Sequence, residues 1–111
     1  MKRIFFCILS IAFILSISAC SKEPDPQFRI LNQRTDKANV QIQTSGGNTI
    51  NINDVQYGQT TAYQSAPEGT IVATAVIQNE SVSPATTFFA AKDTRSTIII
   101  LMGNPPSLRI E

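Results

Sequence analysis

The side chains that most often carry catalysis are scarce in this chain of 111 residues, which holds two cysteines and no histidine. The missing histidine excludes a Ser-His-Asp triad and the usual zinc sites. Catalysis by a Ser–Lys pair would need Lys22, Lys37 or Lys92, and each of these lies in an expected tether or turn. We therefore expect a protein that is not an enzyme.

Acidic residues are also placed poorly for metal chemistry. They stand singly in expected loops, as Asp36, Asp54, Glu68, Glu80 and Asp93. Calcium prefers several oxygen ligands that converge on one point, and no segment is rich in aspartate. We expect solvated turn residues here, with no metal and no cofactor.

Cys20 has the most informative surroundings. It follows Ile17-Ser18-Ala19 at the end of an apolar run, residues 4–17, which begins after Lys2 and Arg3. The run has about the length of a signal-peptide core and falls short of the roughly 20 residues that span a bilayer. An uncleaved membrane anchor and an ordinary secretory signal are the alternatives, but neither needs a cysteine after the small residue.

The segment Ile17-Ser18-Ala19-Cys20 resembles the lipobox of bacterial lipoproteins. The resemblance implies cleavage between Ala19 and Cys20, a diacylglycerol thioether on Cys20, and an acyl chain such as palmitate on its amine. Two or three chains would make attachment effectively permanent, whereas one chain anchors only marginally. The implied location is the bacterial cell envelope, lipid-anchored to the outer membrane on its periplasmic or its surface face.

Removal of the signal leaves a nearly neutral chain. The 9 Lys and Arg residues lose Lys2 and Arg3, so 7 remain against 8 Asp and Glu, a formal charge of −1. Nucleic-acid binding usually needs a basic patch or stripe, so no nucleic-acid partner is expected. Cys7 also leaves with the signal, and Cys20 is then the sole cysteine, so the domain has no disulfide.

The expected organisation is a signal peptide at 1–19, a lipidated cysteine and flexible tether at 20–27, and one domain at 28–111. Period-two alternation marks Val40 and Ile42, then Ile50 and Ile52, with Ser45-Gly46-Gly47-Asn48 between them, which predicts a β-hairpin. Further strands are expected at 60–64, 70–78, 85–91, 96–102 and 108–110. The run 96–102 reads as a central strand buried on both faces. About seven short strands predict an all-β fold, a single small Ig-like antiparallel β-sandwich, with a small β-barrel as the alternative.

Residues 28–110 resemble an envelope family known as domain of unknown function 4397. The resemblance is carried by segments in a characteristic order: Arg29-Ile30-Leu31-Asn32, Ala38-Asn39-Val40-Gln41-Ile42, Val55-Gln56-Tyr57-Gly58-Gln59-Thr60, Tyr63, Pro67-Glu68-Gly69, Thr97-Ile98-Ile99-Ile100, Gly103 and Leu108. The chain departs from the family at Gln41 and Gln43, where members often carry an acidic residue and an aromatic one. The resemblance implies an Ig-like sandwich at the cell envelope and no particular activity.

Three aromatic residues are candidates for partner contact. Tyr57 and Tyr63, with Gln59 and Gln64, could form an aromatic platform among amides that suits a sugar, although Tyr57 is better explained as packing at a sandwich corner. Phe88 and Phe89 are adjacent, so one ring should face the core and the other, Phe89 or Phe88, solvent.

We therefore expect a membrane-anchored envelope lipoprotein that acts as a non-enzymatic binding or structural module for a protein or a glycan. The loops 45–48, 66–69 and 103–106 are expected to make the contacts. The alternative is a periplasmic enzyme inhibitor or an assembly accessory lipoprotein.

Overall fold

The computed structural model describes residues 23–111, which form eight β-strands and no helix. The predicted signal peptide, Cys20 and the cleavage site beside Ala19 lie outside the described residues. The strands are β1 (Gln27–Asn32), β2 (Ala38–Gln43), β3 (Thr49–Val55), β4 (Gln64–Ser65), β5 (Gly69–Ile77), β6 (Ala85–Ala90), β7 (Arg95–Leu101) and β8 (Ser107–Ile110). Within residues 23–111, no helix is long and apolar enough to cross a membrane.

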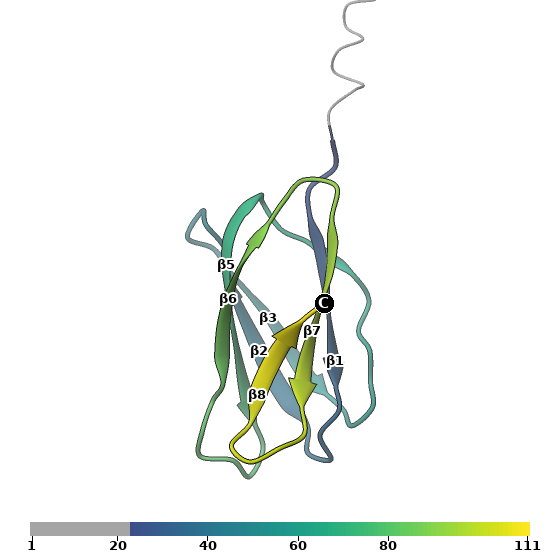
Figure 1. Cartoon of the computed structure of the whole chain (residues 1–111), viewed down its shortest axis with the longest axis vertical. Helices are drawn as coiled ribbons and strands as arrows, with labels where there is room; N and C mark the ends of the chain where they lie inside the picture. Colours follow the sequence, from purple (N-terminus) through teal and green to yellow (C-terminus); the bar gives the residue numbers. More distant parts are fainter. Residues whose placement is uncertain (1–22) are drawn as a thin grey trace, which may run out of the picture.

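The strands build two four-stranded sheets packed face to face (Figure 1). One sheet has the order β4-β1-β7-β8 and the other the order β3-β2-β5-β6. The predicted all-β sandwich is confirmed, and the barrel alternative is not the architecture because the two sheets are separate. The sheets are not purely antiparallel, however, since β1 and β7 run parallel over their whole pairing.

Alternation of apolar and polar residues explains how the sheets face each other. In β2, Ala38, Val40 and Ile42 are buried while the residues between them are exposed. β5 repeats the pattern with Ile71, Ala73, Ala75 and Ile77. Successive side chains of a strand point to opposite faces, so β2 and β5 each contribute one apolar face to a single core.

β7 confirms the expectation of a strand buried on both faces. It lies inside its sheet between β1 and β8, and Ile98, Ile99 and Ile100 are all nearly inaccessible. Ile98 and Ile100 join the core between the sheets, whereas Ile99 points outward. Leu31 and Arg109 flank Ile99 in register, and the aliphatic stem of an arginine can shield such an apolar neighbour.

The predicted hairpin is confirmed as β2 and β3, which pair antiparallel around residues 44–48. A register shift between Ala38 and Val40 interrupts this ladder. Asp54 takes a positive φ of 58° there, and its N–H donates to Asn39 Oδ1 at 2.8 Å. The irregularity blunts the free edge of β3, as β-bulges commonly do.

The strand predicted at 60–64 is largely wrong. Only Gln64–Ser65 forms a regular ladder with β1, and an isolated bridge joins Thr60 to Leu31. Between these points the side chain of Thr61 replaces a main-chain acceptor, because the Ile30 N–H donates to Thr61 Oγ1 at 3.0 Å. This side-chain hydrogen bond holds residues 60–64 along β1, although they form no continuous ladder with it.

The described part of the predicted tether lies against the domain. Pro26 is buried, and its carbonyl accepts a hydrogen bond from the Ala66 N–H at 3.0 Å. The Pro24 carbonyl accepts from the Asp93 N–H at 2.9 Å. Ordered structure therefore begins before the expected boundary at residue 28, because these carbonyls find partners in two neighbouring loops.

One polar side chain, Asn32, is completely buried at the end of β1. Its Nδ2 donates to the carbonyls of Asp36 and Val55, each at 2.9 Å, and its Oδ1 accepts from the Arg34 N–H at 2.9 Å. Buried polar groups are tolerated when they are hydrogen-bonded in this way. Asn32 thus joins β1, the loop after it and the end of β3.

Candidate functional site

Two arginines are held side by side on the outward face of the β4-β1-β7-β8 sheet. The parallel register places Gln27 opposite Arg95 and Arg29 opposite Thr97. Each arginine bonds the residue opposite it: Arg95 Nε donates to Gln27 Oε1 and Arg29 Nε donates to Thr97 Oγ1, both at 3.1 Å. These bonds hold each guanidinium group through its Nε atom.

Tyr63 contacts both arginines and completes what we call the arginine–tyrosine cluster (Arg29, Tyr63, Arg95). The Cζ atoms of Arg29 and Arg95 lie 4.8 Å and 4.9 Å from the centre of the Tyr63 ring. Contacts of this kind are worth about 0.5–1 kcal/mol each at exposed sites. The ring is half-buried, so it serves as a support for the cations.

The same two arginines lack a carboxylate partner among residues 23–111. Six cationic side chains are described: Arg29, Arg34, Lys37, Lys92, Arg95 and Arg109. Four of them form ion pairs, with Glu80, Asp54, Asp25 and Glu111. Every described cation outside the cluster is therefore neutralised locally, while both cations inside it are not.

Their proximity has an electrostatic cost. Since each Cζ lies under 5 Å from the same ring centre, the two charges are at most about 10 Å apart. At that separation they repel by roughly 0.4–1.7 kcal/mol, depending on the effective dielectric, and salt reduces the value. An anion placed between them would remove this cost and interact with both charges.

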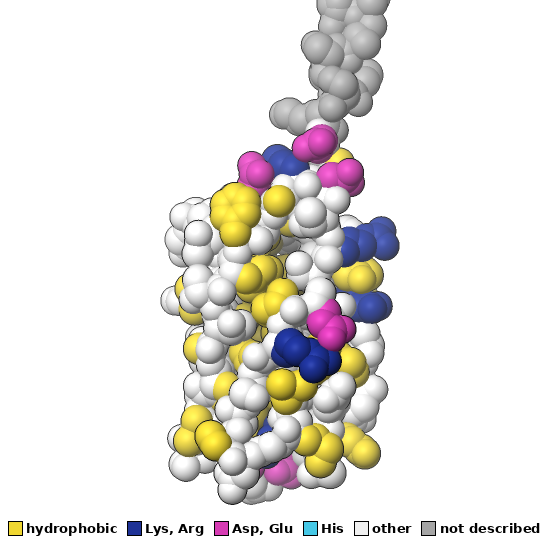
Figure 2. All heavy atoms as spheres, in the orientation of Figure 1, with side chains coloured by type: hydrophobic (Ala, Val, Ile, Leu, Met, Phe, Trp, Pro, Cys, Tyr) yellow, Lys and Arg dark blue, Asp and Glu magenta, His cyan; other side chains and the backbone are white. Residues whose placement is uncertain are grey.

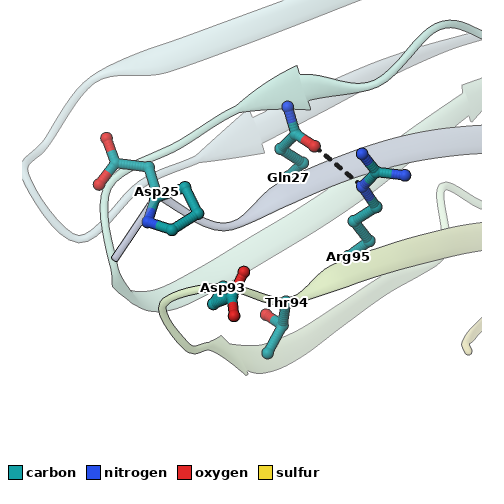
Figure 3. A pocket seen from close by; sticks show the side chains of 6 residues that line it. Asp25, Gln27, Asp93, Thr94 and Arg95 are labelled. Atoms are coloured by element: carbon teal, nitrogen blue, oxygen red, sulfur yellow. Dashed lines mark hydrogen bonds between the residues drawn. The ribbon is translucent and has the colours of Figure 1, made fainter. Parts of the chain in front are cut away.

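A surface hollow of about 640 Å³ adjoins the cluster where the chain enters the domain. Figure 3 shows Asp25, Gln27, Asp93, Thr94 and Arg95 around it, with the bond between Gln27 and Arg95 at one side. Arg95 thus belongs both to the wall of the hollow and to the cluster. The hollow continues the cluster toward the chain entry, but the carboxylates of Asp25 and Asp93 in its wall make it unfavourable for an anion.

The end of the sandwich at the chain entry is acidic. Lys92 Nζ bonds Asp25 Oδ1 at 2.6 Å, and this hydrogen bond, with the negative charges of Asp25, Glu68 and Glu23, raises the pKa of Lys92 above its ordinary value. Figure 2 shows acidic side chains gathered at this end and basic ones along the adjoining flank. Acidic groups therefore predominate at the chain entry, and the arginines of the cluster lie beside that end.

In the β3-β2-β5-β6 sheet, the exposed carboxylate of Asp54 lies on the edge strand β3 and pairs with Lys37. The outward positions of β2, β5 and β6 carry no charge. Amides, hydroxyls and a few apolar groups occupy them: Asn39, Gln41 and Gln43 in β2, Thr70, Val72, Thr74 and Val76 in β5, and Ala85, Thr87 and Phe89 in β6. The two outward faces of the sandwich therefore have different chemistry, and the cationic one is the β1–β7 face.

The structure separates the aromatic residues that were predicted to act together. Tyr57 lies in the turn after β3 with 63% of its surface exposed, so the expected packing at a corner is wrong. Tyr63 lies at the far end of the segment that runs along β1, next to β4. Phe89 is 65% exposed and Phe88 packs on the core, which confirms that one ring of that pair faces solvent. Phe89 belongs to the other sheet, so it shares no site with Tyr63.

The three predicted contact loops also divide between the two ends. The loops 45–48 and 66–69 are neighbours, because Ser45 Oγ donates to the Glu68 carbonyl at 3.2 Å. The loop 103–106 lies at the opposite end, where Arg34 Nη1 donates to the carbonyls of Leu101 and Gly103 at 3.0 Å and 2.9 Å. No single partner surface comprises all three loops.

The described residues offer no cluster of metal ligands. No group of three or more His, Cys, Asp or Glu side chains among residues 23–111 could hold a metal ion. Lys37 and Lys92, two of the lysines considered for Ser–Lys catalysis, are engaged with Asp54 and Asp25. What the arrangement can do is bind an anion through two supported guanidinium groups.

Arg29 and Arg95 were not identified from the sequence. They are 66 positions apart, and only the parallel pairing of β1 and β7 brings them together. The sequence holds only a weak signal for them: each arginine occupies an outward position in a strand whose alternate residues are mostly apolar. Comparison with protein-family models and with curated proteins finds no match to this chain.

Proposed function

We propose that this protein is a non-enzymatic binding module of the bacterial envelope that uses the arginine–tyrosine cluster to hold an acidic ligand. One observation carries the proposal: the two described cations without a carboxylate partner are stacked on the same tyrosine. Charged groups of this kind give strong, directional contacts to carboxylates and phosphates.

The rigidity of the support favours binding. Arg29 and Arg95 stand on neighbouring strands, and a side-chain hydrogen bond and a ring hold each of them. Less side-chain entropy is then lost when a ligand arrives, which increases affinity at a given contact area.

We also propose that the module is anchored through lipid on Cys20, with cleavage after Ala19. The support is the order of residues 17–20 and the apolar run before them. Only a short segment separates Cys20 from Pro24, where ordered structure is already present. The domain would therefore stand close to its membrane.

A site-specific photo-crosslink in the native envelope tests the binding function. A photoreactive residue at Ser65 lies in register with Gln27, beside the cluster, while one at Gln41 lies on the outward face of β2. We expect a crosslinked product from position 65 that disappears when Arg29→Gln and Arg95→Gln are combined, and none from position 41. Equal products from both positions, or a product that survives the double substitution, would contradict the proposal.

Metabolic labelling tests the anchor. Cys20→Ala should abolish palmitate incorporation and leave an uncleaved precursor, whereas Cys7→Ala should change neither. Normal maturation of the Cys20→Ala chain would refute lipidation at this position.

A further inference from the structure

We propose that the acidic ligand is a polysaccharide carrying carboxylate groups at intervals, bound along the outward face of β1, β7 and β8. This inference rests on the proposed function and specifies the ligand of the same site. Four features of the described residues lead to it. They are the terminal Nη groups of the two arginines, the spacing of the arginines, their polar surroundings, and the acidic side chains where the chain enters the domain.

The outer edges of both arginines are available to a ligand. Within residues 23–111, the hydrogen bonds of Arg29 and Arg95 engage only Nε, to Thr97 Oγ1 and Gln27 Oε1. The terminal Nη groups remain for an incoming group. Two parallel N–H donors match the two oxygens of a carboxylate, so each guanidinium can take one carboxylate in a planar, bidentate contact.

A third arginine extends the cationic surface. Arg109 of β8 lies opposite Ile99, four residues along β7 from Arg95, which corresponds to about 13 Å along the strand. Arg29 lies at an intermediate height on β1. Arg109 pairs with Glu111, but both side chains are more than half exposed, and pairs of this kind are weak and exchange readily. Glu111 lies opposite Thr97 on the same face, so the positive charge of the strip is centred on Arg29 and Arg95. Two separate guanidinium groups suit a ligand with repeated charges better than a single small anion.

The surroundings of the strip favour a hydrated chain over a folded protein. The large hydrophobic side chains that are exposed, Tyr57, Val76, Val82, Phe89 and Met102, all lie off this face. Tyrosine and arginine also anchor protein interfaces, but the buried centre of such an interface is mostly apolar. Around the cluster the neighbours are Gln27, Ser65 and Thr97, whose amide and hydroxyl groups can bond sugar hydroxyls, and Glu111, which pairs with Thr97.

The acidic end argues against an anionic lipid surface as the ligand. Glu23, Asp25 and Glu68 surround Lys92 where the chain enters the domain. The proposed anchor holds this same end close to the membrane, so an anionic lipid surface would face these carboxylates before it reached the cluster and be repelled by them. A soluble polymer can approach the strip from the side and avoid them.

The test uses the full chain in phosphatidylcholine nanodiscs and polygalacturonate as the probe. We expect binding at about 0.05 M salt that falls steeply toward about 0.5 M, where screening shortens to a few ångströms. Fully methyl-esterified polygalacturonate, which has the same backbone without charge, should not bind. Arg29→Gln and Arg95→Gln should each weaken binding about tenfold, the loss of one charge-assisted contact. Arg109→Gln, a control on the same face, should weaken it about threefold or less.

Tyr63 provides a second discrimination. Tyr63→Phe keeps the ring beneath both guanidinium groups and should bind within about twofold of the parent chain, while Tyr63→Ala should lose affinity as the single arginine variants do. Circular dichroism confirms that each variant keeps its strands. Equal binding of the methyl-esterified polymer would overturn the proposal.

Other outcomes would overturn the proposal. Polyglutamate binding as tightly as polygalacturonate would refute a polysaccharide ligand, and so would stronger co-sedimentation with phosphatidylglycerol vesicles. No binding of polygalacturonate together with a positive crosslink at position 65 would refute the ligand class and leave the binding module in place. Failure of both experiments would refute the binding function itself.

Discussion

Replacing the buried amide of Asn32 by a carboxyl group tests the internal support of β1 with a change of almost no volume. In Asn32→Asp, the Nδ2 group that donates to the carbonyls of Asp36 and Val55 becomes an oxygen. An ionised carboxylate would then face two carbonyl oxygens at about the same 2.9 Å in a site with no exposed surface. The contact to the Arg34 N–H alone would remain favourable.

The size of the effect follows from the cost of keeping the introduced carboxyl protonated. Its ordinary pKa is about 3.9, so holding the proton at pH 7 costs about 4 kcal/mol at 1.36 kcal/mol per pH unit. A protonated carboxyl has one donor in place of two, and the lost hydrogen bond costs about 1 kcal/mol more. The combined loss of about 5 kcal/mol is comparable with the whole stability of a domain this small, about 4–13 kcal/mol.

The direction in which the destabilisation by Asn32→Asp changes with pH can also be predicted. Burial and the two carbonyls raise the pKa of the introduced carboxyl in the folded state above its unfolded value. The penalty is therefore greatest at neutral pH and shrinks as the pH falls through the raised folded pKa toward the ordinary value. Near pH 4 we expect only the cost of about 1 kcal/mol for the missing donor.

Urea unfolding measured from pH 4 to pH 7 provides the assay, with far-ultraviolet circular dichroism as the signal because the chain has no tryptophan. Asn51→Asp, on the exposed face of β3, is the matched control and should stay within about 0.5 kcal/mol of the parent chain. If Asn32→Asp is as stable as the parent at pH 7, or is destabilised equally at all pH values, the described hydrogen bonds of Asn32 do not support the fold as we argue.

Two other predictions concern the end of the sandwich where the chain enters. Gly69 has a φ of 139°, and a Cβ there would collide with the side chain of Ser45, so Gly69→Ala should lower the unfolding free energy by about 2–3 kcal/mol. Gly46→Ala, with open space around it, is the control, and equal urea midpoints for the two variants would contradict this reasoning. Asp25→Asn should lower the pKa of Lys92 toward its ordinary value, because it removes the hydrogen bond and charge that raise that pKa. An NMR titration of the Lys92 side chain measures this change, Asp36→Asn is the control, and an unchanged Lys92 titration would show that Asp25 is not the cause.

The sandwich could be predicted because its determinants are local. The alternation of Val40 and Ile42 with Gln41 and Gln43 assigns the inward face of β2 without knowledge of its neighbours. The turn at residues 45–48 then requires an antiparallel partner, and the unbroken run around Ile99 requires a central strand. Each of these inferences uses residues fewer than about ten positions apart.

The candidate site could not be predicted because its determinants are distant in sequence. Arg29 and Arg95 meet only through a parallel pairing, and parallel strands are joined by long connections that leave no turn signal between them. Tyr63 was considered for binding, but with Tyr57, since their closeness in sequence suggested one platform. The chain turns at Tyr57, where the Gln59 N–H donates to the Gln56 carbonyl, and then runs along β1, which takes Tyr63 to β4 at the other end of that strand.

The parallel pairing of β1 and β7 has a mechanical consequence. A pull on the chain at Glu23 is directed along β1 and would have to slide this strand past β7, with which it pairs from Gln27 to Asn32. In this loading direction the bonds of the ladder share the force and must break together, unlike the successive opening of a hairpin pulled apart from one end. Arg29 and Arg95 stand on these same two strands, so tension between the chain entry and a held ligand would act on this pair.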